Sequence, residues 1–444
     1  FRAMAADYRF FHDIGVEGIY SQAMGHRGGG GEFSLLRPYY ATELMRNHAL
    51  DPDVVMYDFL QGYYGDAAPP IYRYIKMLQH KVDADDIHMH LYTNPGQGYL
   101  PDAIVAAGQE LFDQAEEAVA NDEKLLDRVR VCRMPLMYAR WFPRNGYEVV
   151  DGKMLFKGDL AKPGEMMAFA ERMAAHGFIN IREWAGSPEE LALYSAALNT
   201  PIPLPTITNA HLAVEVAPFI GGRALRIIDK ATGECVTAYS VVPSLVFPFC
   251  GGEDTRVGVN FSVHEGGPMA LAEVTEQSEN NDAITLSLEA RGFKIERHIA
   301  LVPDRPAVVF TITVTNPGDK AVSTRVKSHL ELDLGDLATT KMAFQSMSGE
   351  SIAMDMHPVI EQMREGRMFH ADTQTLPDGE WAFSGSKGLK VIQRFDPQTV
   401  DLAWVYAFPE ELQDLEVELW RIEEEIPPGQ SVTLRHELEI QPAP

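Results

Sequence analysis

One glycine-rich loop near the start of this 444-residue chain holds side chains that could do acid–base chemistry. Residues 21–33 contain Gln22, His26, Arg27 and Glu32 together with four consecutive glycines. An imidazole, a guanidinium and a carboxyl can hold a polar ligand and protonate it, and glycines let the backbone approach that ligand closely. We therefore predict Glu32 and His26 as catalytic residues, and Gln22 and Arg27 as substrate-binding residues. The alternative is a flexible surface loop in which the glycines only turn the chain.

The elements on either side of this loop indicate how it is positioned. Residues 3–13 have the pattern of a helix, residues 16–20 that of a buried strand, and a second helical pattern follows the loop. This is one repeat of a β/α architecture, and one repeat cannot close a parallel sheet by itself. In β/α barrels the catalytic residues lie at the carboxyl ends of several strands. We expect residues 1–65 to be the C-terminal part of a β/α barrel whose other strands precede Phe1.

Aromatic residues follow this segment closely. Tyr63, Tyr64, Tyr72 and Tyr74 form a cluster in the sequence. Aromatic rings can stack on the apolar face of a sugar, and their hydroxyl groups can satisfy its polar groups. We predict Tyr63 and Tyr64 as substrate-binding residues. Packing between neighbouring helices is the alternative role for tyrosines at this spacing.

Composition excludes several classes of partner. Lys and Arg total 38 against 64 Asp and Glu, which gives a formal charge of −26 that repels phosphate backbones and anionic lipid headgroups. We expect neither a nucleic acid nor a membrane as partner, and no apolar run is long enough to span a bilayer. The three cysteines have neither disulfide nor zinc spacing, so we predict no metal and no cofactor. This composition is compatible with a soluble chain either in the cytoplasm or outside the cell. It does not indicate an oligomeric state.

The remaining chain divides by its hydrophobic period into a multidomain α+β arrangement. Residues 66–200 have helical periodicity and predict a helical bundle. Residues 201–208 contain three prolines and predict an extended linker. Residues 209–444 alternate in short segments separated by turn residues, which predicts a large antiparallel β-sandwich. The fold class is therefore the tail of a barrel, a helical bundle and a sandwich.

The first part of the chain resembles a known family. The motif formed by residues 51–53, 59–68 and 71–74, with weaker support from residues 116–140, is similar to the DUF4838 family of bacterial proteins. Members of this family combine a glycoside-hydrolase-like β/α barrel with a helical extension. The resemblance covers residues 1 to about 200 and implies biology directed at polysaccharides.

The last part resembles the galactose-mutarotase-like sandwich. The segments that carry this resemblance are residues 217–223, 315–319, 328–330, 417–419 and 426–430. Mutarotases use a histidine and a glutamate for acid–base work on the sugar ring, and the resemblance places these roles at His329 and Glu418. The residues that flank His329 depart from the mutarotase pattern, and a second mutarotase histidine has no match. A structural histidine in a degenerate or sugar-binding sandwich is therefore the alternative, and Trp381, Trp404 and Trp420 could be a sugar platform or core residues.

Cleavage of a glycosidic bond usually needs two carboxyl groups, one neutral and one ionised. Glu32 is the best candidate in the barrel segment, because Glu17 lies in a predicted strand, Glu43 in a predicted helix, and Asp51 beside Pro52 fits a helix cap. We expect the second carboxyl on a strand before Phe1. We therefore predict that this chain is part of a carbohydrate-active protein, a glycoside hydrolase. On its own, the chain is expected to be inactive. A non-catalytic carbohydrate-binding or scaffold module is the first alternative, and an aldose-1-epimerase-like sandwich is the second.

Overall fold

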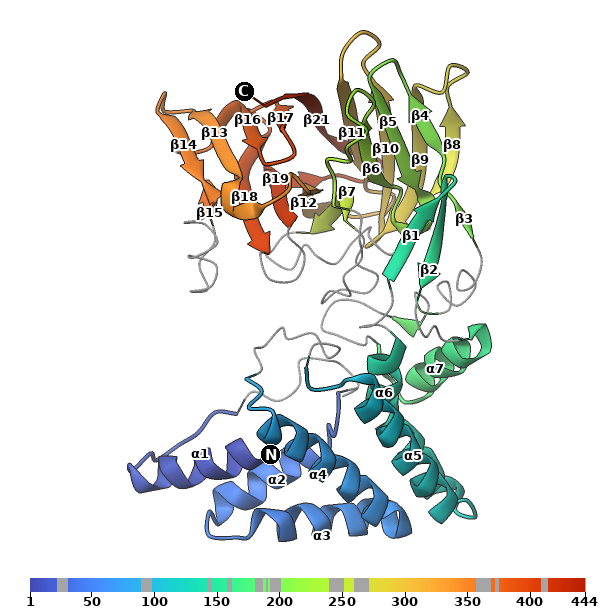
Figure 1. Cartoon of the computed structure of the whole chain (residues 1–444), viewed down its shortest axis with the longest axis vertical. Helices are drawn as coiled ribbons and strands as arrows, with labels where there is room; N and C mark the ends of the chain where they lie inside the picture. Colours follow the sequence, from blue (N-terminus) through green and yellow to red (C-terminus); the bar gives the residue numbers. More distant parts are fainter. Residues whose placement is uncertain are drawn as a thin grey trace. The chain divides into compact units, whose positions relative to one another are not determined.

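The computed structural model describes most of the chain (Figure 1). The described residues are 1–21, 31–88, 98–141, 146–157, 162–179, 187–188, 191, 201–238, 251–258, 271–356, 369–371, 375–408 and 414–443. The chain forms two compact units. We call them the helical unit, drawn from residues 1–145 and 157–199, and the sandwich unit, drawn from residues 146–156, 200–242 and 248–444.

The helical unit is built from amphipathic helices whose apolar faces share one core. Asp51 shows how the sequence starts them: its Oδ1 accepts a hydrogen bond from the amide of Asp53 at 2.9 Å, and Pro52 occupies the first helical position. Helix α5 packs against α4 and α6, and Gly108 on α5 contributes the close approach. The helices are α1 (Arg2–Asp13), α2 (Leu36–Arg46), α3 (Pro52–Tyr64), α4 (Ala68–Ala84), α5 (Asp102–Ala118), α6 (Glu123–Trp141) and α7 (Pro163–Ala175).

No helix in the described residues is both long enough and apolar enough to cross a bilayer. The predicted helices 3–13, 123–140 and 163–176 are confirmed to within a residue or so as α1, α6 and α7. The predicted helix over 188–198 falls mostly outside the described residues.

The predicted strand over residues 16–20 is wrong. The structure assigns these residues no strand, and the described part of residues 1–65 contains helices α1, α2 and α3 only. The apolar side chains that suggested a buried strand are exposed, with Val16 at 41% and Tyr20 at 91% of their full surface. A strand needs a neighbouring strand to satisfy its backbone groups, and none lies beside these residues in the described part of the chain. Barrel ancestry of residues 1–65 stays a prediction.

Two further differences concern strands that the sequence analysis missed. A hairpin of β1 (Gly146–Val150) and β2 (Lys153–Lys157) lies within the region expected to be helical, joined by Asp151 and Gly152, both with positive φ. An Asp-Gly pair in this conformation is the usual two-residue hairpin turn. The predicted linker 201–208 is extended, but it forms strands: β3 (Ile202–Pro203) pairs with β2, and β4 (Thr206–Thr208) pairs with β5.

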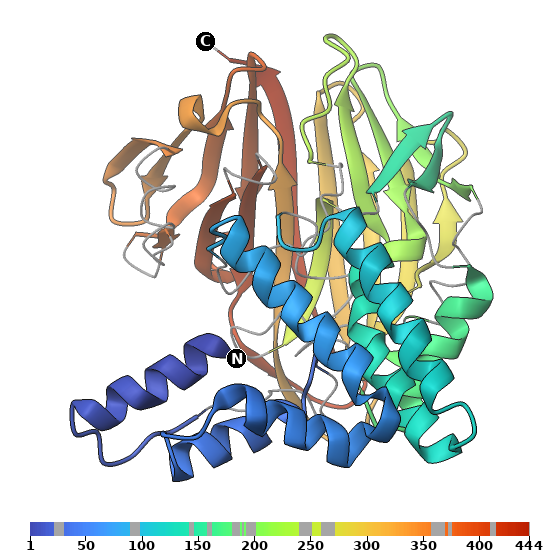
Figure 2. The same ribbon diagram turned by 60° about the horizontal axis from the view of Figure 1, so that its bottom comes forward.

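The sandwich unit contains two large antiparallel sheets (Figures 1 and 2). The first has the order β14-β13-β16-β17-β21-β11-β10-β9-β8; the second, which we call the β12 sheet, has the order β15-β18-β19-β12-β7-β6-β5-β4, with β20 paired to β12. The bounds are β5 (Leu212–Ala217), β6 (Arg223–Asp229), β7 (Gly252–Gly258), β8 (Glu273–Gln277), β9 (Ala283–Ala290), β10 (Phe293–Leu301), β11 (Ala307–Thr315), β12 (Val322–Leu332), β13 (Lys341–Ser346), β14 (Ser351–Asp355), β15 (Phe369–Ala371), β16 (Pro377–Ser384), β17 (Leu389–Phe395), β18 (Val400–Phe408), β19 (Asp414–Arg421), β20 (Glu424–Ile426) and β21 (Ser431–Pro442).

The core of the sandwich unit is formed by every second side chain along each strand. Successive side chains of a strand point to opposite faces, so Val326 and Leu330 of β12 join the core while Lys327, His329 and Glu331 lie on the other face. This arrangement confirms the predicted antiparallel sandwich, and the sandwich unit also takes in residues 146–156 and 200–208. The predicted strands 283–290, 307–315 and 389–395 match β9, β11 and β17 to the residue.

Candidate functional site

Four neighbouring strands, β6, β7, β12 and β19, bring charged side chains onto one face of the β12 sheet. His329 on β12 lies directly opposite Glu418 on β19 and opposite Asp254 on β7. Residues opposite each other in antiparallel strands share a face, and so do residues two apart along a strand. We define the His329 cluster as the eight charged residues gathered in this way: Arg223, Asp254, Arg256, Lys327, His329, Glu331, Glu416 and Glu418.

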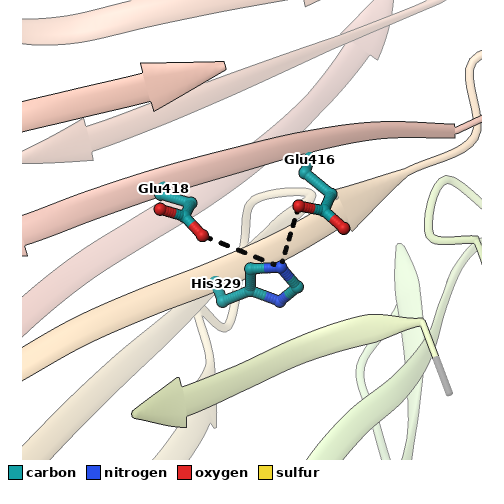
Figure 3. A group of neighbouring side chains, drawn as sticks. All are labelled: His329, Glu416 and Glu418. Atoms are coloured by element: carbon teal, nitrogen blue, oxygen red, sulfur yellow. Dashed lines mark ion pairs between the residues drawn. The ribbon is translucent and has the colours of Figure 1, made fainter. Parts of the chain in front are cut away.

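His329 lies at the centre of this cluster (Figure 3). Its Nε2 is 3.4 Å from Oε2 of Glu416 and 3.9 Å from Oε1 of Glu418. On the other side of the ring, Nδ1 is 3.5 Å from Oδ1 of Asp254 and 3.6 Å from Oε1 of Glu331. Carboxylates therefore face both ring nitrogens.

This arrangement determines the protonation state of the imidazole. Burial and the guanidinium of Arg256, whose Nη2 is 3.2 Å from Nδ1, both lower the pKa of His329. The carboxylates of Glu416 and Asp254 outweigh these effects and raise the pKa of His329 to about 9. His329 is thus an imidazolium at neutral pH, and it can act as an acid.

The neighbouring carboxylates are correspondingly held in their ionised form. Burial alone would raise the pKa of Asp254, but the guanidinium groups of Arg223 and Arg256 keep it well below the usual range. Burial has the same effect on Glu416, and the charge of His329 outweighs it, so that the pKa of Glu416 is lowered. The cluster therefore places the protonated His329, which can donate a proton, beside the ionised carboxylates of Asp254 and Glu416, which can accept one.

The two glutamates of β19 differ in what holds them. Oε1 of Glu418 accepts a hydrogen bond from Nζ of Lys327 at 2.7 Å, and Oε2 accepts one from Nε1 of Trp420 at 2.8 Å. Glu418 is fully buried, whereas Glu416 keeps 9% of its surface exposed. Glu416 is thus the more exposed of the two glutamates, and Glu418 is held in place by two hydrogen bonds.

A divalent cation fits this cluster poorly. His329, Glu416 and Glu418 offer ligand atoms within 4.8 Å of one another. His329 carries a proton there, however, and both oxygens of Glu418 already accept hydrogen bonds. With four cationic and four anionic side chains the cluster is also balanced, so an added cation would be an uncompensated buried charge.

Two of the three tryptophans adjoin the cluster. The rings of Trp404 and Trp420 lie 4.6 Å apart at 49°, and Nζ of Lys327 is 4.9 Å from the ring of Trp420. Trp381 is fully buried in the core of the sandwich unit, where its Nε1 donates to Gln393. A platform could therefore involve Trp404 and Trp420, and Trp381 is a core residue.

The helical unit contains a second candidate site, a cavity of about 250 Å³. Three residues predicted from the sequence, Glu32, Tyr63 and Tyr64, line it together. The other members of the predicted set, Gln22, His26 and Arg27, lie outside the described residues. The full lining is Gly31, Glu32, Phe33, Ser34, Leu35, Tyr63, Tyr64, Arg128, Val131, Cys132, Met134, Pro135, Tyr138, Phe169, Met173, His176 and Phe178.

Glu32 is the acidic residue of this lining. The hydroxyl of Tyr74 donates to its Oε1 at 3.2 Å. Burial raises the pKa of Glu32 against the opposing effects of Arg37 and of the Tyr74 hydrogen bond. The structure therefore favours a neutral carboxyl at this position.

The sequence predicts His329 and Glu418 as site residues, and the structure brings Glu416, Asp254, Arg256 and Lys327, which the sequence does not predict, into the same cluster. The available signal was the alternation of charges at every second residue, as in Lys327, His329 and Glu331. A strand with charges on one face and apolar residues on the other is the pattern of a polar cluster that faces away from the core.

Comparison with known proteins identifies one family and several distant structures. The family described as a domain of unknown function, DUF4838, matches residues 1–76, which confirms the predicted resemblance for this segment. No curated protein matches the chain. A putative aldose 1-epimerase from Escherichia coli K12 is 12% identical, with 54% of this chain and 99% of that one covered and a TM-score of 0.39. A galactose mutarotase-like protein from Lactobacillus casei is 10% identical, with 54% and 100% covered and a TM-score of 0.42.

Proposed function

We propose that this chain is part of a carbohydrate-active protein whose His329 cluster moves protons to and from a bound sugar. The observation that carries this proposal is the contact of His329 with Glu416 and Glu418, in which carboxylates hold the imidazole in its protonated form. General acid–base catalysis needs such a pair within hydrogen-bond reach of one substrate. The adjoining rings of Trp404 and Trp420 could contact the apolar face of a sugar ring.

The reaction that suits this pair is exchange at the anomeric carbon of a free sugar. The anomeric hydroxyl and the ring oxygen are bonded to the same carbon, so the acid and the base must lie close together. His329 would give its proton to the ring oxygen while Glu416 takes the proton of the anomeric hydroxyl, which breaks the ring bond and forms an aldehyde. Closure on the other face reverses both transfers and restores both groups. Glu418, held by Lys327 and Trp420, would position the imidazole.

Hydrolysis at this cluster is less well supported. Glycosidases place two carboxyl groups on either side of the bond that they cleave. Glu416 and Glu418 lie two residues apart on one face of β19, and His329 is within 4 Å of both. Both carboxylates approach the same ring nitrogen, Nε2 of His329, which is not the placement on opposite sides of a bond that hydrolysis uses.

A glycoside hydrolase built on residues beyond this chain is the second candidate function. The observation that favours it is Glu32, whose raised pKa suits a proton donor and which lines a cavity with Tyr63 and Tyr64. Hydrolysis would need a second carboxyl, and Glu32 is the one carboxyl among the described lining residues. On this hypothesis the chain alone would bind a glycan and leave it intact.

Anomer exchange measured by NMR on fresh α-D-glucose and α-D-galactose tests the main proposal. We expect the chain to accelerate exchange and the His329→Ala variant to lose about 10²-fold or more of that acceleration. His298→Ala is the matched control, because His298 is an exposed histidine on β10 that contacts Thr285. Exchange no faster than in buffer would overturn the epimerase proposal. Saturable glycan binding without exchange would support the non-catalytic module, and release of reducing ends by a longer parent protein would support the hydrolase.

A further inference from the structure

The cavity of the helical unit has the composition of a ligand site. Its lining combines aromatic and aliphatic walls with a few polar groups, which is the usual composition of small-molecule pockets. At about 250 Å³ it lies slightly below the usual range of drug-sized pockets, so its size suits one small ring. Every lining residue belongs to the helical unit, so this site is distinct from the His329 cluster of the sandwich unit.

Helix α6 supplies an unusual feature on one wall. Pro135 lies inside this helix and has no amide hydrogen, so the carbonyl of Val131 lacks its usual intrahelical donor. Both residues line the cavity. A proline in a helix interior is destabilising, and its placement beside a cavity provides a backbone acceptor for a ligand hydroxyl.

Glu32 is a second polar group of the lining. Its described hydrogen bond, from Tyr74, uses Oε1, and no described residue donates to Oε2. A carboxyl in this position can hydrogen-bond a ligand hydroxyl through the second oxygen. Tyr64 and the thiol of Cys132 lie on the same lining, and burial raises the pKa of both.

The charged groups of the lining already have partners. The guanidinium of Arg128 lies 4.1 Å from the ring of Tyr63 and donates to the carbonyl of the same residue at 2.8 Å. His176 contacts Asp127 at 3.0 Å, and Asp127 also pairs with Arg172. A ligand without a formal charge therefore matches this lining better than an ion does.

We propose that this cavity is a separate binding site for one uncharged, hydroxyl-bearing ring of the size of a pyranose, held by Glu32 and by the Val131 carbonyl of α6. Aromatic side chains would contact the apolar face of the ring, and Glu32 and the Val131 carbonyl would bond its hydroxyl groups. The proposal extends the carbohydrate function to the helical unit. It does not depend on acid–base chemistry at His329.

Saturation-transfer NMR with the full chain tests the proposal, using the methyl glycosides of glucose, galactose, mannose and xylose as probes. Methyl glycosides cannot exchange anomers, so the epimerase reaction does not interfere. We expect at least one probe to bind. Glu32→Ala should weaken that binding by about tenfold, and Glu32→Gln, which keeps a neutral hydrogen-bonding group, should change it far less. Glu110→Gln, on the exposed side of α5, is the control for the loss of one negative charge.

A second pair of variants tests the location of the site. Val131→Phe fills the cavity and should abolish binding, whereas Val54→Phe, at an exposed position of α3, should leave it unchanged. Binding of none of the four glycosides, or retention of full affinity in Val131→Phe, would overturn the proposal.

Discussion

Asp254 and His329 lie directly opposite each other on β7 and β12, with Oδ1 of the carboxylate 3.5 Å from Nδ1 of the imidazole. This pairing fixes one side of the ring, while Glu416 occupies the other side. The strand register therefore sets the acidity of the histidine, because it places a carboxylate at each ring nitrogen. Arg223 in turn pairs with Asp254 and keeps that carboxylate ionised.

Neutralising Glu416 should lower the pKa of His329 from about 9 toward the value of a free histidine. The Glu416→Gln change keeps the size of the side chain and removes one of the two carboxylates that raise the pKa. Titration of the His329 ring signals by NMR measures the effect. An unchanged pKa of His329 would show that Glu416 does not hold the proton there.

Stability should depend on pH through the same histidine. The pKa of His329 is about 9 in the folded chain against 6.5 in a model peptide, so its stabilising contribution is fully present below pH 6.5 and is lost as the pH rises through 9. Each pKa unit corresponds to about 1.4 kcal/mol, so the contribution is about 3 kcal/mol in total.

Urea unfolding of the chain and of His329→Gln between pH 6 and pH 10 measures this contribution. The difference in unfolding free energy between the two proteins should shrink as the pH rises. His298→Gln, which removes an exposed histidine of β10, is compared in the same way as the control. A constant difference for His329→Gln would mean that His329 does not change its charge in this range.

The sandwich could be predicted from the sequence because its strands carry a local signal. Segments such as 283–290 and 307–315 alternate between apolar and polar residues and end at turn residues. The alternation indicates a strand, and the turn residues indicate where it begins and ends. His329 and Glu418 were found by resemblance to another family. Their meeting depends on the register of β12 against β19, which is a long-range property that spacing along the chain does not reveal.

Other features could not be predicted correctly from the sequence, and each has a physical reason. Val16, Ile19 and Tyr20 have the composition of a buried strand, but burial requires a partner surface, and these side chains are exposed. The β1–β2 hairpin was missed because strong helical patterns on both sides hid the short Asp151-Gly152 turn signal. In the helical unit, the shared cavity of Glu32 and Tyr63 depends on how α3 and α6 pack, and no local pattern encodes that packing.

Gly108 should be sensitive to a single added methyl group. A Cβ atom at this position would lie 2.9 Å from Cδ2 of Leu136 and 2.9 Å from Cε2 of Tyr74, both buried. Gly108→Ala should therefore lower the unfolding free energy by about 1–3 kcal/mol, although alanine favours helix. Gly62→Ala on α3 is the matched control, because nothing lies within 4 Å of its added Cβ, and it should be neutral or stabilising. Equal unfolding free energies for the two variants would contradict close packing of α5 against α4 and α6.

Lys327 and Glu418 form a fully buried ion pair, and the two single changes should differ sharply from the double change. Nζ of Lys327 lies 2.7 Å from Oε1 of Glu418, and burial lowers the pKa of Lys327 while the carboxylate of Glu418 partly offsets that effect. Lys327→Met leaves Glu418 as an uncompensated buried charge and should lower the unfolding free energy by about 3–5 kcal/mol.

The double variant Lys327→Met with Glu418→Gln removes both charges and should recover much of that loss, because an uncharged pair has little desolvation to overcome. Urea unfolding at pH 7 of the parent, both single variants and the double variant gives the coupling energy. Lys341 and Asp355, an exposed pair with Nζ 3.9 Å from Oδ1, serve as the control cycle and should couple by less than about 1 kcal/mol. Additive losses at Lys327 and Glu418 would mean that the two charges are solvated separately, and the charge balance inferred for the His329 cluster would then be wrong.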